Sequence, residues 1–140
     1  MAKKQLSPFM PRKTMDTDYL LKLIEHAFDD IYQELKGKGW RFYLVDQKRG
    51  RCYYREKVVT IPVWVVMNGR VRQWVWYIAH ELSHALVCEK LGISRAKKVG
   101  HGPAFQAILR EICPEDVQHY EYEYKPRNAS AAGLKQKEAV

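Results

Sequence analysis

The chain has 140 residues, of which 46% are hydrophobic and 29% are charged, and its formal net charge is +8. This composition is ordinary for one globular domain with a core. The lack of an apolar run near 18 residues excludes a membrane span, and residues 1–5 lack the apolar segment of a signal peptide behind them. Cys52, Cys88 and Cys113 form no CxxC pair, which indicates reduced thiols in an intracellular protein, either cytoplasmic or associated with the nucleoid or nucleus.

The first predicted element is a helix that follows a basic arm. Residues 1–15 contain two prolines and four basic residues with little periodicity, and we expect them to be flexible. Asp16 is the expected N-cap, and Gly37 and Gly39 are expected to end the helix. An apolar stripe at helical spacing lies between them: Leu20, Ile24, Ala27, Phe28, Ile31 and Leu35.

Three stretches rich in strand-forming residues come next, at 40–45, 51–55 and 58–66. Pro62 cannot donate a ladder hydrogen bond, so it indicates an edge strand or the end of a strand. We expect a small antiparallel or mixed sheet of about three strands, packed on the helices of an α+β fold.

The histidines of an HExxH pattern, His80 and His84, follow the predicted sheet. With about 100° and 1.5 Å per helical residue, the two imidazoles lie roughly 40° apart around the helix and about 6 Å apart along it. Both can therefore reach one ion, and zinc suits them because it binds imidazole nitrogen in tetrahedral geometry. Glu81 would lie beside the metal-bound water without binding the metal, which is the place of a general base.

These three polar residues can meet on a helix by chance, so their surroundings matter. Residues 74–91 contain neither proline nor glycine, which predicts an uninterrupted helix. Apolar residues recur along it at helical spacing and indicate one buried face: Trp74, Val75, Ile78, Leu82, Ala85 and Leu86. Histidines and a glutamate in such a helix are costly to bury unless they have partners, and a zinc ion would be one.

Gly92 is expected to end this helix, and residues 93–100 read as a polar, basic connection. Pro103 suits the first turn of a further helix, and Pro114 ends it. The apolar stripe of that helix consists of Phe105, Ile108, Leu109 and Ile112. Residues 125–140 contain Pro, Asn, Ser, Ala, Gly and Lys, and we expect a disordered tail.

A catalytic zinc site usually has three protein ligands and one open position. The pattern does not continue as HExxHxxGxxH, because Val87 and Lys90 stand in the places of glycine and histidine. His101, between two glycines at a helix start, is the best third ligand, although a capping or surface histidine would have the same setting. Weaker candidates are Glu111, Glu115 and His119.

Residues 80–85 (HELSHA) followed by residues 100–105 (GHGPAF) resemble the motifs of the SprT-like, or Spartan-type, metallopeptidases. The resemblance covers roughly residues 16–115. It implies a zincin-like SprT-like metallopeptidase domain at residues 16–124, with an HGxxF helix after the HExxH helix. It also implies Zn2+ bound by His80, His84 and His101, with Glu81 as the catalytic base.

Better-studied members of that family degrade proteins crosslinked to DNA. We see no downstream zinc-ribbon cysteine pairs, second domain or long interaction tail here, so we expect a minimal version that consists of the protease domain.

The resulting hypothesis is a zinc-dependent endopeptidase in which a metal-activated water attacks a peptide carbonyl and Glu81 is the general base. Proteins bound to DNA are candidate substrates, and the strand around residues 52–54, or its neighbour, would present an edge with which an extended substrate can pair. Tyr53, Tyr54 and His119 are candidate oxyanion stabilisers. Two alternatives stay open: a non-catalytic basic nucleic-acid-binding module with a structural zinc, and an intracellular peptidase with one dedicated protein target.

The excess of basic over acidic residues, with a pI near 9.4, favours an acidic partner such as nucleic acid. A net positive charge also serves solubility. The candidate nucleic-acid contacts are Lys48, Arg49, Arg51, Arg55, Lys97 and Lys98. We therefore expect a monomer whose partners are a protein substrate and DNA, with no membrane partner.

Overall fold

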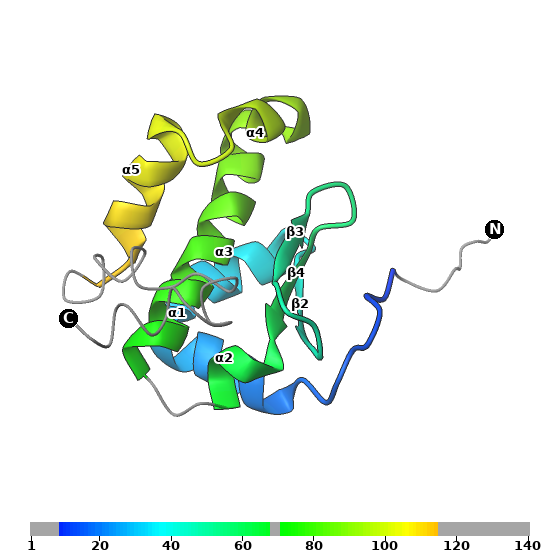
Figure 1. Ribbon diagram of the computed structural model, residues 1–140. Coiled ribbons are helices and arrows are strands. Elements are labelled where there is room, and N and C mark those ends of the chain that lie inside the picture. Colours follow the sequence, from blue (N-terminus) through cyan, green and yellow to red (C-terminus); the bar gives the residue numbers. More distant parts are fainter. Residues whose placement is uncertain (1–8, 68–70, 115–140) are drawn as a thin grey trace, which may run out of the picture.

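The computed structural model of the protein describes residues 9–67 and 71–114. Within these residues, five helices and a three-stranded sheet make up an α+β fold, as predicted (Figure 1). The elements are α1 (Asp18–Gly37), β2 (Arg41–Val45), β3 (Arg51–Tyr53), β4 (Val58–Pro62), α2 (Val63–Met67), α3 (Val71–Leu91), α4 (Ile93–Val99) and α5 (Pro103–Ile112). None of the helices in these ranges has both the length and the apolar character needed to cross a membrane.

Helix α1 turns the predicted apolar stripe toward the core, where Leu20 and Leu35 are fully buried. The helix begins at Asp18 with Thr17 as its N-cap, so the predicted N-cap at Asp16 is one residue early. The Asp16 carboxylate accepts a hydrogen bond from the backbone N–H of Asp18 over 3.1 Å. An aspartate that bonds its own backbone two residues on favours a turn, and this one leads the chain into the helix.

The sheet is mixed and has the order β2-β4-β3. β2 runs parallel to β4 with Arg41 opposite Val58, whereas β3 runs antiparallel to β4 with Arg51 opposite Thr60. All five residues of β4 are buried, as expected for the central strand. The predicted three-stranded sheet is therefore confirmed, and Pro62 marks the end of β4 rather than an edge.

The two outer strands of this sheet have different neighbours. The outer side of β2 meets the segment before α1, where Thr14 forms a bridge with Val45 and the Met15 N–H donates to the Leu44 carbonyl over 2.8 Å. β3 pairs only with β4 among the described residues. Its outer edge therefore has no strand partner within these ranges.

Two predicted segments have a different structure. Residues 63–66 were expected to continue the third strand, but they belong to helix α2. A short apolar run has no periodicity that separates strand from helix, and Pro62 ends the pairing. Residues 93–99 were expected to be a connection, but they form α4, which buries only Ala96 and therefore shows no apolar stripe in the sequence.

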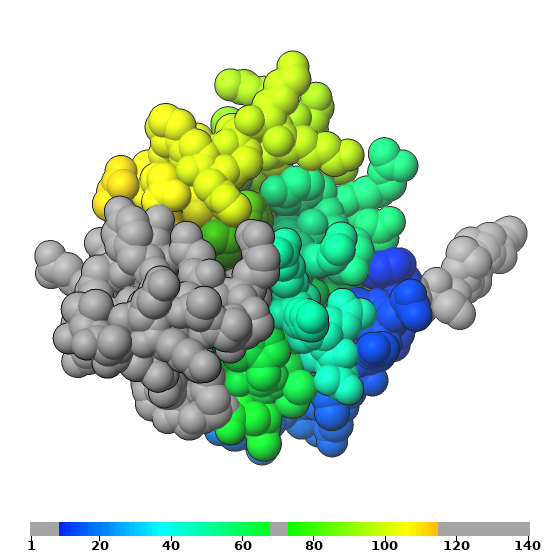
Figure 2. Space-filling model, viewed as in Figure 1, coloured from blue at the N-terminus to red at the C-terminus, as the bar shows by residue number. Residues whose placement is uncertain are grey.

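Helix α3 occupies the centre of the molecule and contacts α1, α2, α4, α5, β3 and β4 (Figure 1). Ile78 and Leu82 on this helix are at most 1% exposed, and burial of each such side chain contributes about 1.5–3 kcal/mol. In the space-filling view, recessed green atoms of α3 lie between the yellow atoms of α5 and the teal atoms of the strands (Figure 2). The HExxH residues are thus on a helix that is held from several sides.

Candidate metal centre

Three imidazoles converge beside the middle of α3. His80 and His84 lie one turn apart on that helix, and His101 comes from the short connection between α4 and α5. Each histidine offers one ring nitrogen, either Nδ1 or Nε2, as a ligand atom. These three nitrogens lie within 4.8 Å of one another. The structure thus brings together the three residues that the sequence predicts as metal ligands.

The connection that carries His101 is a tight turn flanked by two glycines. Gly100 has a backbone φ of +53°, a value that residues other than glycine rarely adopt. The N–H of Gly102 donates to the Val99 carbonyl over 2.7 Å, and a Cβ atom on Gly102 would lie 2.9 Å from that oxygen. The two glycines therefore let the chain reverse directly after α4 and bring His101 to α3.

The spacing of the ring nitrogens fits a zinc ion. The Nε2 atoms of His84 and His101 are 3.2 Å apart. Two nitrogens bound at about 2.0–2.1 Å to a tetrahedral zinc lie about 3.3–3.4 Å apart. Without an ion, one proton between these nitrogens would join the two rings as a hydrogen bond. Three histidines are also a ligand set that zinc enzymes use, so the donor chemistry agrees with the geometry.

Burial keeps two of the three rings uncharged. It lowers the pKa of His80 to about 3, with a further contribution from His84 and His101. It also lowers the pKa of His84 to about 4, again with a contribution from His101. A neutral imidazole is the form that binds a metal, so no proton has to leave these rings at neutral pH. His80 also has a buried Nδ1 without a hydrogen-bond partner among the described residues, and an ion or a water molecule would explain such a group.

The aromatic ring of Phe105 packs against all three histidine rings. The ring centroid of Phe105 is 4.4 Å from that of His84 and 5.0 Å from those of His80 and His101, and Phe105 is fully buried. The ring centroid of Trp76 lies 5.0 Å from that of His80. The apolar stripe of α5 predicted that Phe105 is buried, but nothing in the sequence indicated its contact with the histidines. Trp76 could have been found from its i,i+4 spacing to His80, which puts both side chains on one face of the helix.

Glu81 is next to the first histidine and is only 6% exposed. Among the described residues, no hydrogen bond or ion pair involves its carboxylate. Burial raises the pKa of Glu81 to about 8. A cation held by the neighbouring imidazoles would oppose this effect, because a nearby positive charge favours the ionised carboxylate. A carboxyl group with a pKa in this range can both accept and return a proton near neutral pH.

The turn after β3 also reaches the histidines. The hydroxyl of Tyr54 lies 3.3 Å from Nδ1 of His84, and the two ring centroids are 6.5 Å apart. Tyr54 was predicted only as a candidate oxyanion stabiliser, together with Tyr53 and His119. His119 lies outside the described residues, as does Glu115, one of the weaker third-ligand candidates.

The other predicted site residues lie apart from the histidines. Glu111 is exposed on α5 and is not in the cluster. The six basic residues are all exposed, with Lys97 and Lys98 on α4 and the other four in or beside β3: Lys48, Arg49, Arg51 and Arg55. Their exposure leaves them accessible to an acidic partner, and their role in binding nucleic acid stays a prediction.

A comparison with known protein families finds a family to which the sequence is similar. The sequence model of the SprT-like family matches residues 20–126, which is most of the chain and includes both the HExxH and the HGxxF motif. No curated protein and no solved structure gave a significant match. Because this match covers most of its length, the chain belongs to the SprT-like family.

Proposed function

We propose that the protein is a zinc-dependent endopeptidase of the SprT-like type with a zincin-like active site. One observation carries the proposal: three imidazoles converge within 4.8 Å beside a buried glutamate that has no protein partner among the described residues. Membership of the SprT-like family supports it. His80, His84 and His101 would hold the ion, and the fourth position would face the substrate.

A bound zinc ion would lower the pKa of a water molecule in the open position toward 7 and polarise the scissile carbonyl. The protein residues supply the remaining steps. Glu81 accepts the proton of the attacking water and later delivers it to the leaving amine. The buried rings of Phe105 and Trp76 pack against the histidines and leave less room for water, so that charges inside the site are screened less.

The substrate would be a protein segment in extended conformation. β3 has an outer edge that no described strand covers, and Tyr54 in the following turn lies against His84. A peptide that adds to this edge by main-chain hydrogen bonds would pass the three histidines. We also propose that the protein acts inside the cell as a monomer, which is consistent with free thiols at Cys52, Cys88 and Cys113.

Replacing Glu81 with glutamine tests the proposal. The Glu81→Gln variant should keep its zinc, because Glu81 is not a ligand, and should lose cleavage of casein or of itself by about 10²–10⁴-fold. Metal content and peptide cleavage, with and without DNA, are the measurements. Glu25→Gln, an exposed position on α1, is the matched control and should leave both unchanged. Full cleavage by purified Glu81→Gln would rule out this base, and wild-type protein without zinc would rule out the enzyme.

A second candidate function is a non-catalytic nucleic-acid-binding module with a structural zinc, which the exposed basic residues on α4 and around β3 favour. A buried glutamate beside the histidines argues against it, because a structural site does not need that residue. DNA binding whose affinity falls steeply with salt would support DNA as a partner of either function. Cleavage that is indifferent to DNA would favour the third candidate, a peptidase with one dedicated protein target.

A further inference from the structure

We infer that Tyr54 is a positioning residue of the metal centre: its hydroxyl accepts a hydrogen bond from Nδ1–H of His84 and so fixes the tautomer and the orientation of that ligand. This role rests on the proposed function, because the tautomer of His84 matters only if the ring binds a metal through Nε2. A group that holds the second nitrogen of a ligand histidine commonly strengthens metal binding in zinc proteins.

The two nitrogens of the His84 ring face different partners. Nε2 lies 3.2 Å from Nε2 of His101, at the point where the histidines converge. Nδ1, on the other side of the ring, lies 3.3 Å from the Tyr54 hydroxyl. If Nε2 binds a cation, the single proton of the neutral ring must be on Nδ1, where it can be donated to Tyr54. The contact therefore favours the tautomer that metal binding requires.

The location of this hydroxyl excludes another role for it. Tyr54 faces the nitrogen that points away from the convergence of the histidines, so it lies behind a ligand rather than beside the open coordination position. Burial raises the pKa of Tyr54 to about 12, with smaller electrostatic contributions from Cys52, Cys88 and Glu81. The hydroxyl therefore stays neutral. Tyr54 should therefore affect metal binding more than the stabilisation of an oxyanion.

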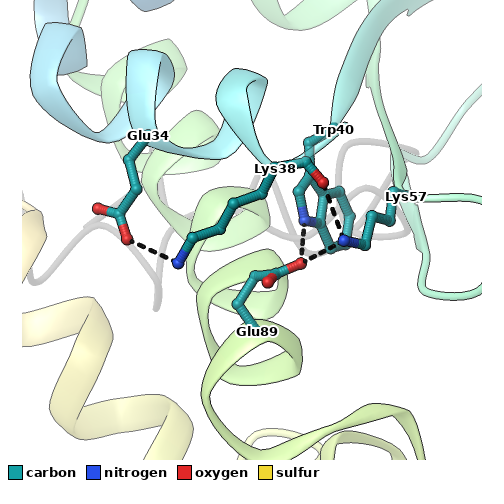
Figure 3. A network of polar contacts seen from close by, with 5 residues as sticks. All are labelled: Glu34, Lys38, Trp40, Lys57 and Glu89. Carbon is teal, nitrogen blue, oxygen red and sulfur yellow. Dashed lines mark hydrogen bonds and ion pairs between the residues drawn. The ribbon is translucent and has the colours of Figure 1, made fainter.

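The turn that carries Tyr54 is also joined by an ion pair to α3, the helix that carries His84. It closes with a hydrogen bond from the Lys57 N–H to the Tyr54 carbonyl over 3.3 Å. The Lys57 ammonium group lies 3.1 Å from the carboxylate of Glu89, one turn beyond His84 on α3, and also donates to the Lys38 carbonyl over 2.9 Å (Figure 3). The turn thus contacts α3 at both of its ends, which limits movement of the hydroxyl relative to the imidazole.

The test is the zinc affinity of Tyr54→Phe, which removes only the hydroxyl. Competition with a chromophoric chelator should show a dissociation constant raised by about 10–100-fold. Tyr43→Phe is the matched control, because it also removes a hydrogen-bonded hydroxyl, the one that accepts from Arg41 over 3.0 Å on β2. It should bind zinc like the wild type. An unchanged zinc affinity in Tyr54→Phe would overturn the inference.

A second measurement keeps the inference testable if Tyr54→Phe does not fold. In the zinc-loaded wild type, the nitrogen-15 spectrum of the histidines should show a slowly exchanging proton on Nδ1 of His84, close in space to the Tyr54 ring. A metal-bound Nδ1, or an Nδ1 proton that exchanges as fast as that of a free imidazole, would overturn it. If the wild type binds zinc but lacks this slowly exchanging proton, the inference on Tyr54 fails and the proposed function stands. If the wild type binds no zinc, the inference and the proposed function both fail.

Discussion

Two glutamates on helix α3 have opposite surroundings. Glu81, in the middle of the helix, is buried without a hydrogen-bonding partner among the described residues, and burial raises its pKa to about 8. Glu89, about two turns later, accepts hydrogen bonds from Trp40 over 2.7 Å and from Lys57 over 3.1 Å (Figure 3). Burial alone would raise the pKa of Glu89, but these hydrogen bonds, with the charges of Lys57 and Lys38, lower it below its usual value.

The difference shows which carboxylate serves the fold and which is available for chemistry. A glutamate that is fully paired holds three segments together: the end of α1, the turn between β3 and β4, and α3. A buried glutamate that is left without partners lowers stability unless something else, such as a bound cation and a substrate, uses it. Groups of one type whose pKa values are pushed apart by their environments commonly have different roles in an enzyme.

The largest expected effect is the loss of zinc affinity when one histidine of the metal centre is removed. His101→Ala removes one of three nitrogen ligands, so the zinc affinity should fall by more than the roughly 10–100-fold typical of losing a supporting residue. Because His101 is exposed, the free energy of unfolding of the metal-free protein should change by no more than about 0.5 kcal/mol. Zinc titration and urea unfolding of the apoprotein measure the two effects. A zinc affinity like that of the wild type would show that His101 is not a ligand.

An intermediate effect is expected from breaking the paired glutamate. Glu89→Ala leaves the Nε1 of Trp40, a residue only 1% exposed, without its acceptor, which should cost about 1–3 kcal/mol in the free energy of unfolding. The lost ion pair should add little, because the Lys57 side chain is 39% exposed and screened by solvent. Glu89→Gln keeps an oxygen acceptor and should cost less, as urea unfolding would show. Equal stability of Glu89→Ala and wild type would mean that this network does not hold α3.

The smallest expected effect is the dependence of the Glu89 contribution on pH. Because the folded-state pKa is lowered, the ionised carboxylate contributes stability above the unfolded-state value of about 4.3, and this contribution is lost as the pH falls through the folded-state pKa. The difference in unfolding free energy between wild type and Glu89→Gln should therefore be constant above about pH 5 and shrink toward pH 3. A difference that grows on acidification would contradict the assignment.

The sequence predicts the half of the site that depends on local geometry. His80 and His84 share a face because they are four residues apart on a helix, and Glu81 follows from its place between them. The position of His101 depends on the turn at Gly100 and Gly102 and on how α5 packs against α3, so spacing alone left several candidates for the third ligand. The setting between two glycines made His101 the best of these candidates, the family motif implied the same residue, and the fold brings it beside the other two histidines.

Contacts that depend on tertiary packing could not be predicted. The approach of Tyr54 to His84 joins residues 30 apart in the sequence, and no periodicity signals it. Helices α2 and α4 were missed for a related reason, since one consists of apolar residues without a pattern and the other buries only Ala96. The burial of α3 was predicted only in part: the apolar stripe, which repeats over about three turns, is mostly buried, but Trp76, Tyr77 and Ala79 off that stripe are buried as well.

The most direct test of the central claim is X-ray absorption spectroscopy of the zinc-loaded protein at a stoichiometry of one ion per chain. Three imidazoles around one ion predict a first shell of nitrogen and oxygen at about 2.0–2.1 Å, with the imidazole contribution reduced by about one third in any zinc that His101→Ala retains. A shell that contains sulfur at about 2.3 Å, or wild-type protein that retains no zinc, would contradict the three-histidine centre.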